Sequence, residues 1–220
     1  ASFPAYYEGD YADALRIFRA AARTGVVSIQ GRWVDAICYH TMVGECYYHL
    51  GDLAAALEQY DSAVRVFLSQ QGWLLRVKFP PQISPHGVRT PRITWGSSNR
   101  RSILGKIPGK MLSLQGRFDN ARVAQQGGVI ALPKMEPLGV PEILRCMALA
   151  TRRRTELMGP ASRHDKMAAQ LVQALEVRPV QANHWSQGWI DALLGVAYAG
   201  IGKNDQAQTH LSRAIVLAGQ

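Results

Sequence analysis

The chain has 220 residues, a formal net charge of +9 and three cysteines. This length allows one or two ordinary domains with a sizeable core. No run of about 18 apolar residues is present, so no membrane-spanning helix is expected, and the odd number of scattered cysteines argues against a disulfide framework. We therefore expect a cytoplasmic protein. Because the chain starts with Ala1 rather than Met, we also expect a processed protein or a fragment of a longer chain.

The first clearly predicted pair of helices lies in residues 37–67. Apolar residues recur at three- and four-residue steps in both halves, so each half can bury one face of a helix. Gly51 can end the first helix in the left-handed conformation, and Asp52 can cap the second. Gly44 lies in the middle of the first helix, where glycine costs about 0.5–1 kcal/mol relative to alanine. This cost indicates a close approach by another helix.

The order of small and aromatic residues in this hairpin resembles the tetratricopeptide (TPR) repeat, a helix–turn–helix unit of about 34 residues. His40 stands where the family has tryptophan, and the later proline is absent. The resemblance implies an all-α fold in which helical hairpins stack into an α-α superhelix, with residues 1–220 forming a single domain. The residues that carry it are Gly44, Tyr47, Gly51, Leu53, Ala56, Tyr60 and Ala63.

The same pattern recurs less completely in four other stretches. Residues 9–21 match only the second helix of a unit, and a linker at 24–31 follows. Residues 109–128 predict a third hairpin from the spacing of Gly109 and Gly116, although Pro108 should kink its first helix. Residues 141–179 predict a fourth unit, with a stop at Gly159–Pro160 and Asp165 as a candidate cap. Residues 194–214 predict a last, clear hairpin.

Residues 71–99 interrupt the repeats with four prolines, which forbid continued helix. We expect a long inserted loop here, and loops of this length are usually functional or disordered. Eight Lys or Arg residues and no acidic residue lie between Arg76 and Lys110. The residues singled out in this basic loop are Arg76, Lys78, Arg89, Arg92, Trp95, Arg100 and Arg101.

No catalytic or metal site is expected. Residues 105–110 lack the spacing and the hydroxyl residue of a phosphate-binding loop. Cys46 and His49 could share a metal on one helix, but two ligands do not make a site. The sequence contains neither a GxSxG elbow nor an HExxH motif. We therefore expect no enzyme activity and no cofactor.

The resemblance implies a concave face, lined mainly by first helices, that holds a peptide or a partner's helix. The family's groove positions fall on Thr41, Glu45, Tyr48 and His49 of the hairpin at residues 37–67 and on Lys106 and Lys110 of the third hairpin. Arg145 and Arg152 are placed from the expected first helix of the fourth unit. A groove of Lys and Arg would favour acidic peptides.

Three functions are compatible with these observations. The first is a protein–protein interaction scaffold. The alternative is a nucleic-acid-binding repeat protein that uses the basic loop 76–110, since phosphate contacts and aromatic stacking suit single strands. Its affinity should fall steeply with salt. The third is an enzyme with the loop as a lid, which no acid–base pair supports.

Overall fold

The computed structural model describes residues 3–28, 31–89, 102–115, 124–128, 134–177 and 179–218. Helices predominate in this part of the chain, which confirms a mainly helical fold. Three short two-stranded sheets accompany them. The elements are α1 (Phe3–Glu8), α2 (Tyr11–Arg23), β1 (Val27–Ser28), β2 (Gly31–Arg32), α3 (Ala36–His49), α4 (Leu53–Ser69), the 3-10 helix η1 (Trp73–Arg76), β3 (Ser84–Arg89), β4 (Ser102–Lys106), β5 (Met111–Gln115), β6 (Lys134–Leu138), α6 (Val140–Met158), the 3-10 helix η2 (Gly159–His164), α7 (Lys166–Glu176), α8 (Gln187–Gly200) and α9 (Asn204–Ala218).

Helices α3 and α4 form the hairpin that the sequence predicts. Gly51 has a φ of +84° in the turn, and the Asp52 carboxylate accepts a hydrogen bond from the Ala55 amide at 3.0 Å. A Cβ atom built on Gly44 would lie 2.6 Å from the ring of Tyr60, which is fully buried. The close approach expected at Gly44 is therefore confirmed, and Tyr60 fills the space.

Helices α8 and α9 repeat this arrangement at the other end of the chain. Gly202 has a φ of +75° in the turn between them. A Cβ atom on Gly195 would lie 2.5 Å from the side chain of Leu211, the counterpart of Tyr60. The last predicted hairpin is thus confirmed, with the same glycine-and-large-residue contact between its helices.

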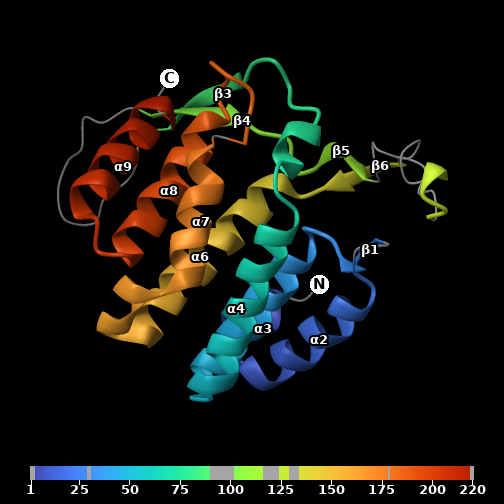
Figure 1. The fold of residues 1–220 in the computed structure, drawn as a ribbon, viewed down its shortest axis with the longest axis vertical. Coiled ribbons are helices and arrows are strands. Elements are labelled where there is room, and N and C mark those ends of the chain that lie inside the picture. Colours follow the sequence, from blue (N-terminus) through green and yellow to red (C-terminus); the bar gives the residue numbers. More distant parts are fainter. Residues whose placement is uncertain are drawn as a thin grey trace.

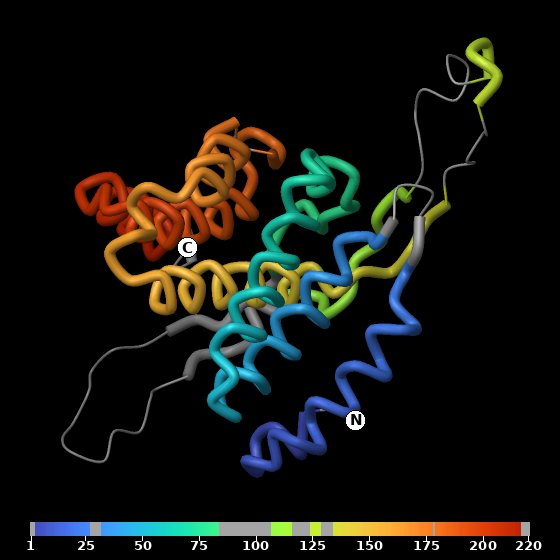
Figure 2. Tube along the Cα trace, turned by 60° about the horizontal axis from the view of Figure 1, so that its bottom comes forward, coloured from blue at the N-terminus to red at the C-terminus, as the bar shows by residue number. Residues whose placement is uncertain are grey.

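Helix α6 lies at the centre of the molecule (Figure 1). It contacts α3 and α4 on one side and α8 on another, while α7 contacts both α4 and α8. Figure 2 shows the N-terminal helices and helices α7–α9 on opposite sides of α6. One cluster of buried side chains runs from Ala14 in α2 to Ala207 in α9, so the helices share a single core.

The predicted first helix of the third hairpin is wrong, and residues 116–123, which belong to its expected second helix, lie outside the described part of the chain. Part of its expected span forms strand β5, which pairs antiparallel with β6, and the predicted groove residue Lys106 lies in strand β4 rather than on a helix. Pro108 and Gly109 explain why no helix forms here, because they interrupt it. In the structure, buried Met111 and Ser113 alternate with the exposed Leu112, as in a half-buried strand.

The first part of the expected loop is joined to the core. Trp73 in η1 is buried, and β3 pairs with β4. Phe79 packs in a cluster of rings with Trp185 and Trp189, and the Pro80 carbonyl accepts a hydrogen bond from Trp185 Nε1 at 3.0 Å. These contacts attach Phe79 and Pro80 to the first turn of α8 and the residues just before it. Residues 90–99 lie outside the described part of the chain.

Candidate functional site

The best-defined polar site lies where α3 meets α6, and we call it the α3–α6 face. It contains the four predicted groove residues of α3, namely Thr41, Glu45, Tyr48 and His49, and side chains of α6 and α1. Thr41 is fully buried, and its hydroxyl donates to the Cys146 carbonyl at 3.2 Å. This bond ties the middle of α3 to α6. A partner therefore cannot contact Thr41 unless α6 moves away.

Glu45 is the centre of the face. Its side chain is 2% exposed and accepts a hydrogen bond from Arg153 Nε at 3.0 Å. The Tyr60 hydroxyl donates to it at 2.5 Å and the Tyr6 hydroxyl at 3.3 Å. Burial, together with the Glu45 carboxylate, holds the pKa values of Tyr6 and Tyr60 above the usual value, so both rings keep their protons as donors. One carboxylate thus connects α1, α3, α4 and α6.

Tyr48 extends this network towards the surface. The Arg153 guanidinium lies over its ring at 4.0 Å from the centroid, a favourable cation–π contact. The Tyr48 hydroxyl donates to Glu156 at 2.6 Å, and Arg153 donates to the same carboxylate at 3.0 Å. These two hydrogen bonds hold the pKa of Glu156 below its usual range. Arg153 therefore joins the buried Glu45 to the half-exposed Glu156.

His49 ends the α3 side of the face and is exposed. Its ring stacks on Tyr11 of α2 with a centroid distance of 4.3 Å and an interplanar angle of 8°. Its Nε2 atom lies 3.4 Å from the Tyr6 hydroxyl. The ring therefore contacts two tyrosines.

On α6, the structure separates the two predicted arginines from the buried network. Arg145 forms a paired contact with Glu142, at 2.6 Å through its terminal nitrogen and 2.8 Å through Nε. Arg152 is exposed, and its neighbour Arg153 is the residue that reaches Glu45. We call the exposed or half-exposed residues Tyr48, His49, Arg145 and Arg152 the rim of the α3–α6 face.

Besides Lys106, four of the predicted basic residues lie in described segments other than α3 and α6. Lys110 is exposed in the turn before β5. Arg76 ends η1, and Lys78 is exposed, with its amide donating to the Leu112 carbonyl at 2.8 Å. Arg89 ends β3. Arg92, Trp95, Arg100 and Arg101 lie outside the described residues.

Arg154 is a buried cation that the sequence did not assign. Its Nε donates to Asp61 of α4 at 2.5 Å, and it also pairs with Asp165, which caps α7. Burial alone would raise the pKa of Asp165, but the hydrogen bonds from Arg154 and from the α7 amides bring it below the usual value. The sequence signal for a buried arginine was the run Arg152–Arg154. Three successive residues point in different directions around a helix, so one or two of them must face inward.

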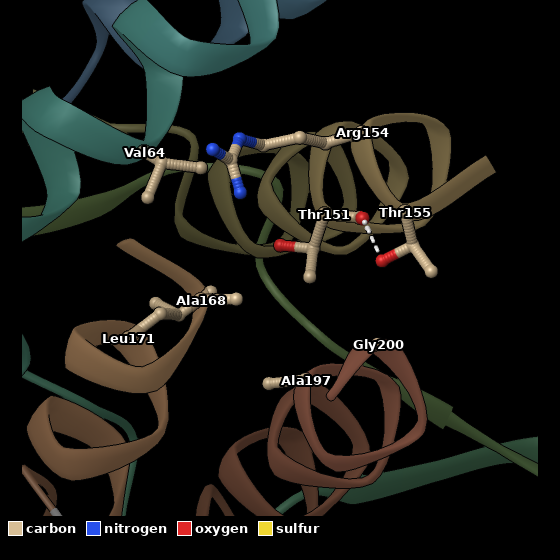
Figure 3. A pocket seen from close by; sticks show the side chains of 8 residues that line it. All are labelled: Val64, Thr151, Arg154, Thr155, Ala168, Leu171, Ala197 and Gly200. Atoms are coloured by element: carbon tan, nitrogen blue, oxygen red, sulfur yellow. Dashed lines mark hydrogen bonds between the residues drawn. The ribbon is translucent and has the colours of Figure 1, made fainter. Parts of the chain in front are cut away.

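A small cavity lies beside Arg154, between α4, α6, α7 and α8 (Figure 3). Its volume is about 10 Å³, which is room for one water molecule at most. Thr151 and Thr155 line it, and both hydroxyls already donate to carbonyls of α6. The cavity is too small for a substrate or a cofactor.

Within the described ranges, no group of three or more His, Cys, Asp or Glu side chains could hold a metal ion. None of the helices described there is long and apolar enough to cross a membrane. No protein-family model, curated protein or solved structure matches the chain.

Proposed function

We propose that the chain is a protein-interaction scaffold built from TPR-like helical hairpins, and that it binds an extended segment of a partner along the rim of the α3–α6 face. The observation that carries the proposal is the packing of α3, α6 and α8. Helices α3 and α8 are the first helices of their hairpins, and α6, which packs on α4 rather than on α7, contacts both of them. First helices that lie side by side form the concave face of a helical-repeat scaffold.

The chemistry of the rim supports contact with a protein. Tyrosine and arginine are enriched at protein interfaces, and they contribute much of the energy there. Tyr7 of α1, which is 76% exposed, packs edge-on against Tyr6, whose hydroxyl lies 3.4 Å from His49. Beneath the rim, the Glu45–Arg153 pair holds Tyr48 in place. A surface that is already ordered loses less conformational entropy when it binds.

The charge of the face gives little preference for an acidic partner. Arg145 is paired with Glu142, and Arg153 is shared between Glu45 and Glu156. An acidic side chain of a partner would have to compete with these carboxylates, but it could meet Arg152 directly. The proposal therefore rests on the rings and on hydrogen bonding to an extended segment, with Arg152 as the position for an acidic group.

The experiment is affinity capture from a source lysate, followed by quantitative mass spectrometry. The bait is the native chain or the double variant Tyr48→Ala/Arg152→Glu. The matched control is Arg19→Glu, a charge reversal at an exposed position on α2. We expect a set of proteins that the native and control baits retain and that the double variant loses, while circular dichroism shows equal helical content.

The same capture, run with and without nuclease, separates the two classes of partner. Retention that survives nuclease and depends on the rim supports a protein partner. Retention that nuclease abolishes would contradict the proposal and favour the nucleic-acid alternative. Equal retention by the double variant would show that the rim is not the binding surface.

A further inference from the structure

The basic residues at the start of the chain are concentrated on one helix. Residues 1–61 contain eight acidic residues, four arginines and no lysine. Three of the arginines lie on α2, and the fourth, Arg32, donates to the Ala22 carbonyl at 2.7 Å, near the C-terminal end of that helix. A stretch that is acidic overall therefore carries all of its arginines at one place. The three arginines of α2 are Arg16, Arg19 and Arg23.

The three arginines line a shallow groove along the exposed side of α2, at the edge of the molecule (Figures 1 and 2). Its volume is about 440 Å³, and its other lining residues are the exposed Ala12 and Ala20 and the half-buried Leu15. The buried Ala14 and Phe18 lie on the opposite side of the helix. Steps of three and four residues place the arginines within about 60° of one another around the helix and spread them over about 10 Å along its axis. They therefore form a single row of cations.

Most of this positive charge is not neutralised. No carboxylate pairs with Arg19 or Arg23 within the described part of the chain. Arg16 pairs with Asp13 at 2.5 Å, but its side chain is 75% exposed, and an exposed pair of this kind is weak. Asp13 and the capping residue Asp10 lie at the N-terminal end of α2. The helix therefore carries negative charge at its first turn and positive charge along the groove.

We propose that this groove is a second docking surface, and that its occupant is an acidic amphipathic helix of a partner protein, lying antiparallel to α2. A helix with acidic residues at steps of four and three presents them at the spacing of the three arginines, so all three can pair in one register. A guanidinium group binds a carboxylate through two parallel hydrogen bonds, which lysine cannot do. Antiparallel packing places the acidic first turns of the partner beside Arg19 and Arg23 and opposes the two helix dipoles.

The lining of the groove favours a helix over a nucleic acid strand or an anionic membrane. Its six residues include no aromatic ring on which a base could stack. A continuous row of phosphates would also meet Asp10 and Asp13, whereas a helix can restrict its acidic residues to the positions that face the arginines. The exposed Ala12 and Ala20 leave room for the side chains of a partner helix, and Leu15 offers an apolar contact.

The test uses the native chain and a synthetic alanine-rich peptide of about 20 residues, which is long enough to form a helix. Three glutamates at steps of four and three lie on one face of this peptide, beside a leucine. The control peptide has the same composition, with its glutamates distributed around the helix. Binding is measured by fluorescence anisotropy at low salt, and the contact surface is mapped by amide chemical shifts. We expect the first peptide to bind more tightly than the control and to shift the amides of residues 11–23.

Charge reversal identifies the contacts. The double variant Arg19→Glu/Arg23→Glu changes two exposed positions, so its helical content should equal that of the native chain. Its affinity for the acidic peptide should fall by about tenfold or more. A peptide with lysine at the first two of the three glutamate positions should bind this variant more tightly than the native chain, because antiparallel packing brings those positions to residues 23 and 19.

The groove and the rim are tested separately. The rim variant Tyr48→Ala/Arg152→Glu should bind the acidic peptide as the native chain does, and in affinity capture Arg19→Glu and the rim variant should lose different proteins. Single-stranded DNA and vesicles of equimolar phosphatidylserine and phosphatidylcholine serve as alternative probes. Equal affinity for the two peptides, amide shifts outside α2, or tighter binding of DNA or vesicles through Arg19 and Arg23 would overturn the proposal.

Discussion

Glu45→Ala is the substitution that the structure predicts to be most destabilising among the charged residues of the α3–α6 face. The native carboxylate is 2% exposed and accepts hydrogen bonds from Arg153 and two tyrosines. Its loss leaves the Arg153 guanidinium, which is only 19% exposed, without its buried partner. Breaking a buried pair in this way costs about 3–5 kcal/mol. In a domain of this size that loss lowers the melting temperature by about 6–20 °C.

The assay is urea denaturation followed by circular dichroism, with thermal melts of the same samples. Glu58→Ala is the control, because Glu58 is exposed on α4 and its loss should change the free energy of unfolding by no more than about 0.5 kcal/mol. Arg153→Ala should also be destabilising, because it leaves the Glu45 carboxylate, which is 2% exposed, with two tyrosine donors but without its cation. A loss below about 1 kcal/mol for Glu45→Ala would refute the reasoning, because such a value is expected only for an exposed pair.

Two further substitutions test the packing and the electrostatics. In Gly44→Ala the new methyl group meets the buried Tyr60 ring, so overpacking of about 1–3 kcal/mol should exceed the gain of about 1 kcal/mol in helix propensity. Urea denaturation should show a lower free energy of unfolding, and a stabilised variant would contradict the close approach of the two helices. Asp165 has a lowered pKa beside Arg154, so its stabilising effect is present at neutral pH and is lost as the pH falls below about 4, the usual value. Denaturation at pH 7 and at pH 3 should therefore show a smaller loss of stability on acidification for Asp165→Asn than for the native chain, and equal losses would count against the Arg154–Asp165 pair.

The features that could be predicted from the sequence are those with a local physical cause. Gly51 and Gly202 adopt a positive φ at turns where the pattern predicts a break. Asp52 and Asp165 cap the helices that follow them, because their carboxylates reach the first free amides. The glycine at position 44 predicted a close helix contact, and the structure places a tyrosine ring there.

The end of any helix near residue 108 could have been predicted, but a coincidence obscured it. The spacing of Gly109 and Gly116 matches the glycines of a TPR unit, and this favoured a helical hairpin. Pro108 is the competing signal, because proline interrupts a helix. The period of the strand is not visible in the sequence, since Leu112 is the exposed residue and Ser113 is buried. The strand pairs with Lys134–Leu138, which lies well beyond it in the chain.

The buried part of the candidate site could not be predicted, because it depends on how α6 packs on α3. Glu45 has the position of a partner contact in the family, but Arg153 and two tyrosines enclose it here. The sequence predicted Arg152 as the groove residue, whereas Arg153 makes the contact. Successive side chains leave a helix about 100° apart, so the two arginines point in different directions. Sequence periodicity does not fix this rotation when the turn to the next helix has an irregular length.

The most direct test of the scaffold is hydrogen–deuterium exchange of the chain alone and saturated with a protein recovered by the native bait. We predict added protection in peptides that cover residues 41–49 of α3 and 142–156 of α6, with no change on the exposed side of α9. Protection confined to residues 76–110, or to any surface that leaves α3 and α6 unchanged, would contradict the assignment of the rim as the binding surface.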